Sequence, residues 1–69
     1  MNADEGRRER KKRARRSRIY ETARHLFLEH GVAATTVEQI AEAADVAQTT
    51  FFNHFQSKSA VLGEMVGEV

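Results

Sequence analysis

Cysteine and proline are both missing from this 69-residue chain. Without cysteine there is no disulfide framework and no thiolate metal site, which fits a reducing cytoplasm. Without proline, and with Ala, Glu and Arg abundant, little interrupts helix formation, and no stretch alternates between apolar and polar residues. The sequence therefore predicts an all-α protein, and its length allows one domain.

Long apolar runs are missing as well. No run approaches the ~20 residues that a membrane-spanning helix needs. The basic start, MNADEGRRERKK, is not followed by the apolar segment of a secretory signal. We therefore expect a cytoplasmic protein without a membrane partner.

Groups that support catalysis or bind metals are scarce. The chain shows no arrangement typical of a nucleophile and no glycine-rich phosphate loop, and it is too small for a substrate cleft beside a core. His25 and His30 are five residues apart, whereas two metal ligands on one helical face are four apart. We therefore expect no enzyme activity, no metal site and no cofactor.

Charge is distributed unevenly along the chain. Residues 1–18 carry nine Arg and Lys against three acids, a net charge of +6, whereas residues 19–69 carry two against seven, a net charge of −5. Residues 1–16 have too few apolar side chains to offset the entropy lost on ordering, which predicts a disordered basic arm. Such an arm is either a solvated tail or a segment that lies along phosphates or enters a DNA minor groove.

Residues 36–55 organise the rest of the chain, and they begin with a short predicted helix. Thr35 and Glu38 match a capping box, so this helix should begin near Thr36. Its apolar face comprises Val37, Ile40, Ala41 and Ala44, which recur at helical spacing.

A tight turn and a second short helix follow. Asp45 adopts the left-handed backbone of a turn more easily than most residues. Val46 should pack in the space between the two helices. The second helix is expected over residues 48–54, with Phe51 and Phe55 four apart on one side. Two helices at a steep angle form a helix-turn-helix, whose second helix enters the DNA major groove.

Two further helices flank this unit. The first should run from Arg16 or Ser17 to His30, where Gly31 supplies the left-handed C-terminal cap. The last should begin near Ser57, a good N-cap. Their apolar stripes comprise Ile19, Ala23, Leu26, Phe27 and His30 in the first helix, and Val61, Leu62, Met65, Val66 and Val69 in the last. The predicted centre of the core is Leu26, Phe27, Val37, Ile40, Val46, Phe51 and Phe55.

Residues 17–69 resemble the DNA-binding domain of TetR-family transcriptional repressors, whose pattern runs roughly T-V-x-x-I-A-x-x-A-G-V-S-x-x-T-L-Y-x-H-F-x-x-K. The matching residues are Thr36, Val37, Ile40, Ala41, Ala44, Val46, Thr50, His54, Phe55 and Lys58. Three positions depart from it, because Asp45 replaces the turn glycine, Phe51 replaces Leu, and Phe52 replaces a Tyr whose hydroxyl commonly touches phosphate. The resemblance implies a homeodomain-like bundle of three helices and the start of a fourth.

The second helix of the motif carries the predicted base-reading residues, Gln48, Thr49, Thr50 and Asn53. Gln and Asn pair bidentately with adenine, and a Thr methyl group can meet the thymine methyl group. Without the resemblance, four polar residues would be read as ordinary solvated surface.

Contacts to the DNA backbone are expected on both sides of this helix. Thr35 and Thr36 offer hydroxyl and amide groups at a helix start, and Lys58 lies beside another helix start. His54 either touches phosphate or interacts with the helix end as a cap. The remaining candidates for the backbone are Arg15, Arg16, Arg18 and Phe52, of which Phe52 would pack on sugar or a thymine methyl group or close the edge of the core.

The resemblance also implies what the whole protein does. It predicts a bacterial, nucleoid-associated transcriptional regulator, most simply a repressor, that binds double-stranded operator DNA as a homodimer. A C-terminal domain for dimerisation and a small-molecule inducer is absent from residues 1–69, so this chain should be monomeric. An Arg-rich RNA-binding or protein-interaction module is the alternative, because an arginine-rich arm fits either function.

Overall fold

Four α-helices follow one another in the computed structural model, which describes residues 3–67 and, within the first helix, side chains from Glu9 onward. They are α1 (Ala3–His30), α2 (Val37–Ala43), α3 (Gln48–His54) and α4 (Lys58–Gly67). The described residues contain no strand. The predicted all-α class is therefore confirmed.

Helix α1 starts much earlier than predicted. It begins at Ala3 rather than at Arg16 or Ser17, so the segment expected to be a disordered arm is helical from Ala3 onward. The physical reason is local, since Arg, Lys, Ala and Glu are good helix formers and no proline interrupts them. One pair at i and i+4 adds to this, with Glu9 Oε2 3.7 Å from an Arg13 guanidinium nitrogen.

The end of α1 is as predicted. Gly31 has a positive φ of 84°, and its N–H donates to the Phe27 carbonyl at 2.8 Å. A residue with a Cβ would be strained in this left-handed conformation, which is why glycine suits the helix end.

The capping box of α2 lies one residue later than predicted. Thr36 is the N-cap: its hydroxyl accepts from the Gln39 N–H, and its own N–H donates to Gln39 Oε1, both at 3.1 Å. Thr35 is not available for this role because it is buried and its hydroxyl donates to the Gly31 carbonyl at 2.8 Å. Thr35 thereby provides a donor to a carbonyl just beyond the end of α1, where carbonyl groups have no partner within the helix.

The turn of the helix-turn-helix is confirmed. Asp45 has a φ of 59°, the left-handed conformation that its short polar side chain tolerates. The Val46 N–H donates to the Ala41 carbonyl at 2.9 Å, which closes the turn, and Val46 packs half-buried against the core. Helix α3 then begins at Gln48, as predicted.

All four helices contribute to one small core. The buried apolar residues are Ile19, Ala23, Phe27, Ile40, Ala41, Ala44, Phe51, Phe55 and Val61. Leu26, Val37 and Val46, which were predicted at its centre, are only partly buried around it. Burying each large side chain stabilises the fold by about 1.5–3 kcal/mol. Val61 is the contribution of α4, whereas Val66 is exposed, and Val69 lies outside the described residues.

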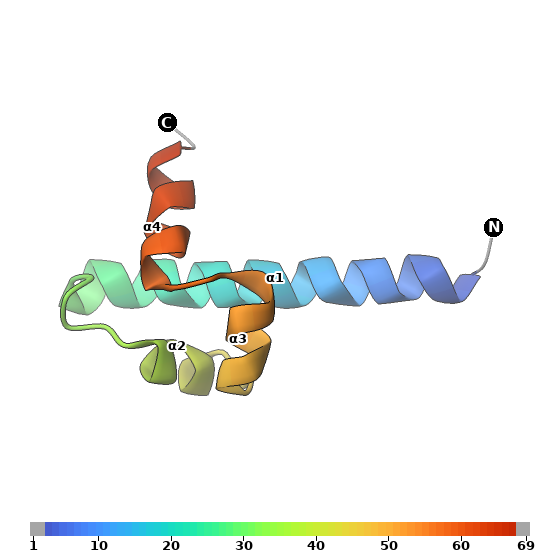
Figure 1. Cartoon of the computed structure of the whole chain (residues 1–69), viewed down its shortest axis with the longest axis horizontal. Coiled ribbons are helices and arrows are strands. Elements are labelled where there is room, and N and C mark those ends of the chain that lie inside the picture. The colour runs from blue at the N-terminus through green and yellow to red at the C-terminus, as the bar shows by residue number, and fades with distance from the viewer. Residues whose placement is uncertain (1–2, 68–69) are drawn as a thin grey trace.

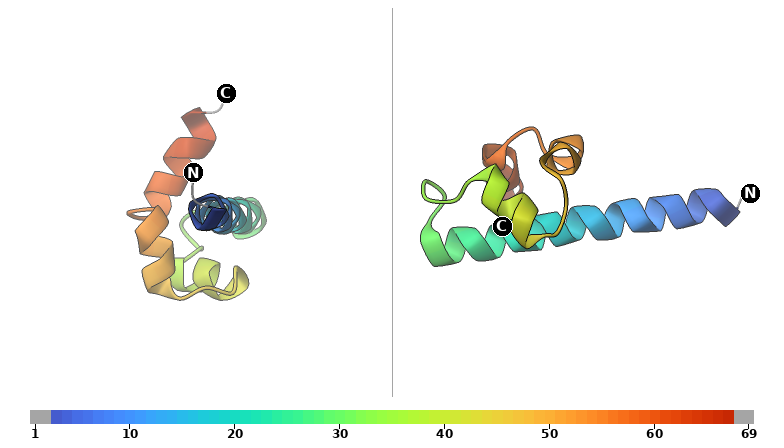
Figure 2. Two further views of the ribbon diagram at one scale, coloured as in Figure 1. Left: turned by 90° about the vertical axis from the view of Figure 1, so that its right-hand side faces the viewer. Right: turned by 90° about the horizontal axis from the view of Figure 1, so that it is seen from below.

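Helix α1 is the axis on which the other helices are arranged (Figure 1). Helices α2, α3 and α4 wrap around one side of its C-terminal half, as an end-on view shows (Figure 2). The N-terminal half extends beyond them, and the molecule is therefore elongated, with extents of 44 × 28 × 18 Å. No helix within residues 3–67 is apolar over a length that could cross a membrane.

Candidate nucleic-acid interface

Helix α3 places its polar residues opposite its buried side. Phe51 and Phe55 are four residues apart and both point into the core. Thr49 and Asn53 lie on the other side and are exposed, Gln48 is exposed at the N-terminal end of the helix, and Thr50 is half-buried. The four residues predicted to read bases therefore lie at or near the surface of one short helix.

Phe52 lies at the edge of this surface. Its side chain is 50% exposed, and its ring meets the ring of Phe51 edge-on, with centroids 5.4 Å apart. Phe52 is thus anchored to the core on one edge and presents the rest of its ring to solvent. This arrangement combines the two alternatives predicted for it, a core edge and an apolar contact surface.

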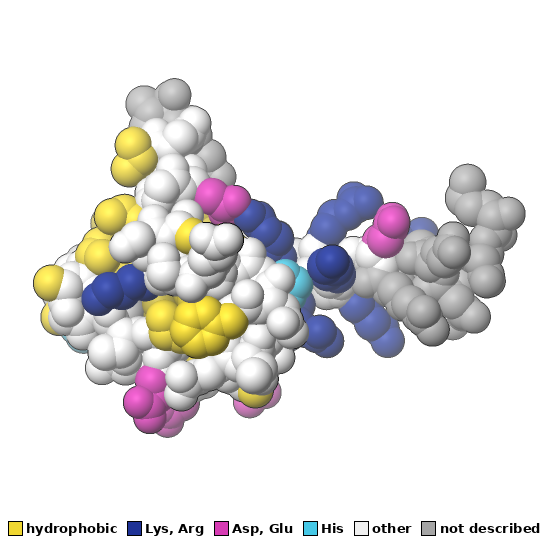
Figure 3. All heavy atoms as spheres, viewed as in Figure 1, with side chains coloured by type: hydrophobic (Ala, Val, Ile, Leu, Met, Phe, Trp, Pro, Cys, Tyr) yellow, Lys and Arg dark blue, Asp and Glu magenta, His cyan; other side chains and the backbone are white. Residues whose placement is uncertain are grey.

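The projecting half of α1 supplies most of the positive charge. Lys and Arg side chains gather there, while the acids on the visible face lie mainly over the body formed by the other helices (Figure 3). The side chains described in this half, from Glu9 to Arg18, are all exposed. Arg15 and Arg18 therefore lie at the surface, as a phosphate contact requires.

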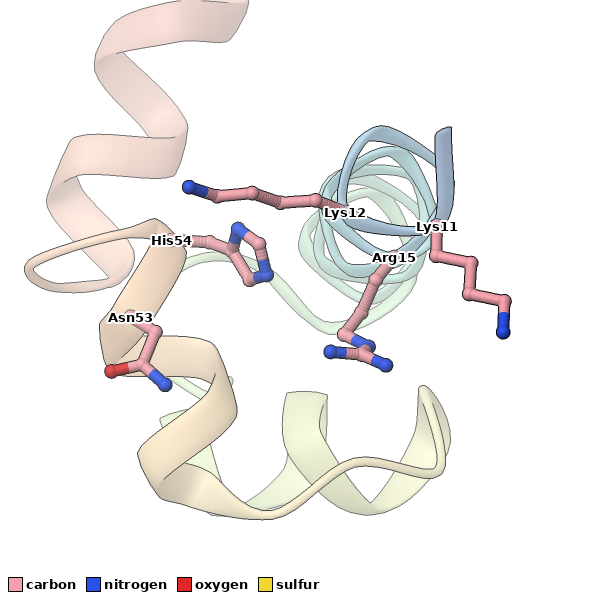
Figure 4. Close-up of a pocket in the computed structure, with 5 residues that line it drawn as sticks. All are labelled: Lys11, Lys12, Arg15, Asn53 and His54. Carbon is pink, nitrogen blue, oxygen red and sulfur yellow. The ribbon is translucent and has the colours of Figure 1, made fainter. Parts of the chain in front are cut away.

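A hollow of about 460 Å³ lies where α1 passes the end of α3. Its lining residues are Lys11, Lys12, Arg15, Asn53 and His54. The imidazole of His54 points from α3 toward α1 and lies between the side chains of Lys12 and Arg15, whereas Lys11 points away from α3 (Figure 4). The hollow thus joins the cationic half of α1 to the polar helix α3.

The electrostatics of this hollow disfavour a further positive charge. Partial burial lowers the pKa of His54 below its ordinary value, and the cationic side chains of Lys12, Arg15 and Arg16 lower this pKa further. In the absence of an anion, His54 therefore tends toward its neutral form.

The exposed side chain of Arg16 contacts other parts of the fold at the surface. Its guanidinium forms an ion pair with Glu64 of α4 and lies over the ring of Phe55, with Cζ 4.7 Å from the centroid. Arg16 thereby links α1, the end of α3 and α4, a role that the sequence did not reveal. A phosphate contact from Arg16, which stays a prediction, would compete with this ion pair.

Comparison with known proteins agrees with this architecture. The profile of the family described as "Bacterial regulatory proteins, tetR family" matches residues 19–65. This chain belongs to the tetR family. Among its relatives is the HTH-type transcriptional regulator TcmR of Streptomyces glaucescens, which is 52% identical over 56 residues, or 81% of this chain and 25% of TcmR.

Two further relatives are named as repressors. The HTH-type transcriptional repressor KstR2 of Rhodococcus jostii is 38% identical over 55 residues, which cover 80% of this chain and 27% of KstR2. The probable acrEF/envCD operon repressor of Escherichia coli is 40% identical over 50 residues, which cover 72% and 23% of the two chains. The chain therefore spans about a quarter of the length of these relatives and contains their N-terminal DNA-binding domain. No solved structure matches it.

Two residues predicted to contact phosphate, Lys58 and Thr35, also take part in the fold of this TetR-family domain. Lys58 Nζ donates to the carbonyls of Val32 and Thr35 at 2.9 and 2.8 Å, and thus ties the start of α4 to the loop before α2. The Thr35 hydroxyl is buried and donates to Gly31. Both side chains are used inside the domain because the loop between α1 and α2 leaves carbonyl groups that need donors. Thr36, by contrast, is exposed at the start of α2.

Sequence reasoning missed Lys11 and Lys12 as part of a site with α3. A signal for Lys12 was present, because Lys12, Arg15 and Arg16 precede Ile19 at spacings of three and four residues. These three cations therefore lie on the face of α1 that carries the buried stripe. They lie closer to the N-terminus, where this face extends past the core. The prediction of a disordered arm concealed this continuity.

Proposed function

We propose that this chain is the operator-reading domain of a transcriptional repressor and binds double-stranded DNA sequence-specifically. Helix α3 would enter the major groove, where helices of this type contact base edges. The observation that supports this most strongly is the polar, uncharged surface of α3 opposite Phe51 and Phe55, directly beside the cationic half of α1.

In this proposal base reading and backbone binding fall to different residues. The base-reading residues are Gln48, Thr49, Thr50 and Asn53. Amide side chains discriminate adenine by two hydrogen bonds, which contribute about 1–3 kcal/mol of specificity for a good bidentate pair. Contacts to the backbone come from Arg15, Arg18 and Thr36, with Phe52 against sugar or a thymine methyl group. Such contacts fix position and add affinity without reading sequence.

The whole regulator is proposed to be a cytoplasmic homodimer. Two copies of the domain would bind half-sites about one helical turn apart, as symmetric helix-turn-helix proteins do. Dimerisation and an inducer site for a small molecule would belong to a C-terminal domain, and residues 1–69 alone would bind one half-site as a monomer. Sedimentation of the 69-residue chain tests this, because a tight dimer without DNA would contradict it.

Selection from a pool of random duplexes tests the proposal without knowledge of the operator. The recovered duplex is then compared with a scrambled duplex and with single-stranded RNA, by fluorescence anisotropy at two salt concentrations. We expect a preference for the recovered duplex that persists at the higher salt concentration. Equal affinity for all three nucleic acids would instead support a non-specific arginine-rich binding module.

A further inference from the structure

The hollow between α1 and α3 is built from side chains that donate hydrogen bonds and carry positive charge. Lys12 and Arg15 extend from α1 on either side of the His54 imidazole, and the Asn53 amide lies at the edge toward the outer surface of α3 (Figure 4). None of the lining residues is acidic. An uncompensated group of this kind attracts an anion, and phosphate oxygens accept from Lys, Arg and imidazole donors.

We propose that this hollow holds one backbone phosphate of the bound duplex, clamped by Lys12 and Arg15 from α1 and by His54 from α3. The inference rests on the proposed DNA-binding function and deepens it, because it assigns one phosphate to a site made jointly by two helices. A phosphate contact from His54 is one of the two alternatives that the sequence predicted; the hollow adds Lys12 and Arg15 as partners at the same phosphate and couples the contact to proton uptake by His54.

The position of the hollow favours a DNA phosphate over a free anion. It lies at the end of the same helix whose outer surface would face base edges, and Asn53 borders both surfaces. A strand whose bases meet α3 must pass its backbone along the flanks of that helix. The cationic half of α1 occupies one flank, so a phosphate on that side meets Lys12 and Arg15.

Proton uptake on binding follows from the charges around His54. The groups that face it are Lys12, Arg15 and Arg16 of α1, and Glu64 of α4 pairs with Arg16. Burial and these cations lower the pKa of His54 in the free domain. A phosphate in the hollow places a negative charge beside the imidazole, and the C-terminal end of α3 also favours a cation. The pKa of His54 should therefore rise when DNA binds.

The sign of the resulting pH dependence is fixed. Between the lowered pKa of the free domain and the higher pKa of the complex, the complex binds more protons than the free domain does. Affinity for DNA therefore rises as the pH falls through this window. It becomes independent of His54 below the lower pKa, where the imidazole is protonated in both states.

NMR of the imidazole nitrogens tests the proposal most directly. The 69-residue chain is titrated with acid, alone and with a duplex selected from a random pool. We expect the duplex to raise the pKa of His54 by about 1 or more, as an opposite charge within a few ångströms does. A pKa of His54 that stays constant or falls in a saturated complex would overturn the proposal.

Variants that remove equal charge inside and outside the hollow distinguish a local phosphate site from an effect of the overall charge of α1. Lys12→Gln with Arg15→Gln should abolish most of the rise in the His54 pKa. Arg10→Gln with Arg13→Gln removes two charges from the same helix but outside the hollow, and should leave this rise intact while it weakens binding to every duplex. Equal loss of the rise in both variants would show that His54 senses only the overall charge of α1, which contradicts the proposal.

Two further outcomes are decisive. If no duplex binds the chain, the proposed function fails; if a duplex binds without moving the pKa of His54, only the phosphate site fails. Inorganic phosphate alone distinguishes the source of the anion. We expect it to raise this pKa much less than the duplex does at the same phosphate concentration. An equal rise would identify an adventitious ion only, and would overturn the assignment to the DNA backbone.

Discussion

The two halves of α1 are one continuous helix, but different forces hold them in place. The C-terminal half buries Ile19, Ala23 and Phe27 against the other helices. The described part of the N-terminal half is exposed throughout and carries seven of the chain's Arg and Lys residues from Arg10 to Arg18. One half therefore stabilises the fold through apolar burial, and the other carries charge outward beside the proposed DNA-reading helix. Function can reside in a helical segment that adds almost nothing to the core.

The strongest test of this contrast is a truncation in the buried half. Phe27→Ala should cost about 3–5 kcal/mol of unfolding free energy, because it removes a buried ring and leaves a cavity. A loss of this size would leave so small a domain largely unfolded. Leu28→Ala is the matched control, since Leu28 is the next residue but 70% exposed, and it should shift stability by less than about 0.5 kcal/mol. Similar losses in urea denaturation for both variants would contradict the packing described for α1.

Substitution of Lys58 tests whether this side chain stabilises the fold or contacts a DNA phosphate. Lys58→Met should lower stability by about 1–3 kcal/mol, because the Thr35 carbonyl loses the Lys58 donor and the Val32 carbonyl keeps only the Thr35 N–H. It should leave the salt dependence of DNA binding unchanged under conditions where the variant is folded. If Lys58 contacted phosphate instead, the slope of log affinity against log salt would fall by about one. Thermal denaturation and salt titration of the same variant distinguish the two roles.

Glu64 forms an ion pair with Arg16, and its substitution should change stability less than that of Lys58 does. Both side chains of this pair are about two-fifths exposed, so Glu64→Gln should change stability by no more than about 1 kcal/mol. Glu64→Gln should strengthen non-specific DNA binding, because Arg16 is then free to contact a phosphate. One added phosphate contact makes the slope of log affinity against log salt steeper by about 0.9. Glu21→Gln is the control, since Glu21 pairs with Arg24. An unchanged slope in Glu64→Gln would show that Arg16 serves the fold alone.

The smallest predicted effect is the pH dependence of stability that His54 contributes. Its pKa in the folded domain is lowered below that of the unfolded chain. Between these two values the unfolded chain binds more protons, so stability falls as the pH decreases through the window and is restored above the ordinary pKa of about 6.5. Thermal denaturation of the wild type and of His54→Gln across this range checks the sign. A stability that rises on acidification because of His54 would contradict it.

The helix-turn-helix was readable from the sequence because its signals are local. Apolar spacing, an aspartate in the turn and a glycine at the end of α1 each predict one feature from a few neighbouring residues, and Asp45 and Gly31 have the expected backbone. The capping box was misplaced by one residue because two adjacent threonines compete for the same role. Only the tertiary contact of Thr35 with Gly31 decides which of them is buried.

The site was only partly readable, because its decisive contacts join distant segments. Lys58 contacts a loop more than twenty residues earlier, and Arg16 contacts Glu64 across 48 positions. A charged residue looks the same in the sequence whether it faces phosphate or a carbonyl group. The polar side chains of α3 were easier to place, since the pattern of Phe51 and Phe55 fixes which side of that helix is buried.

The central claim is that α3 reads bases while the cationic half of α1 binds the backbone. It is tested most directly by the ratio of affinities for a selected and a scrambled duplex, measured by anisotropy for Asn53→Ala and Arg15→Ala. The account predicts that Asn53→Ala loses about 1–3 kcal/mol on the selected duplex only, so that the ratio collapses. Arg15→Ala should weaken both duplexes alike and preserve the ratio. A preserved ratio in Asn53→Ala together with a collapsed ratio in Arg15→Ala would contradict this account.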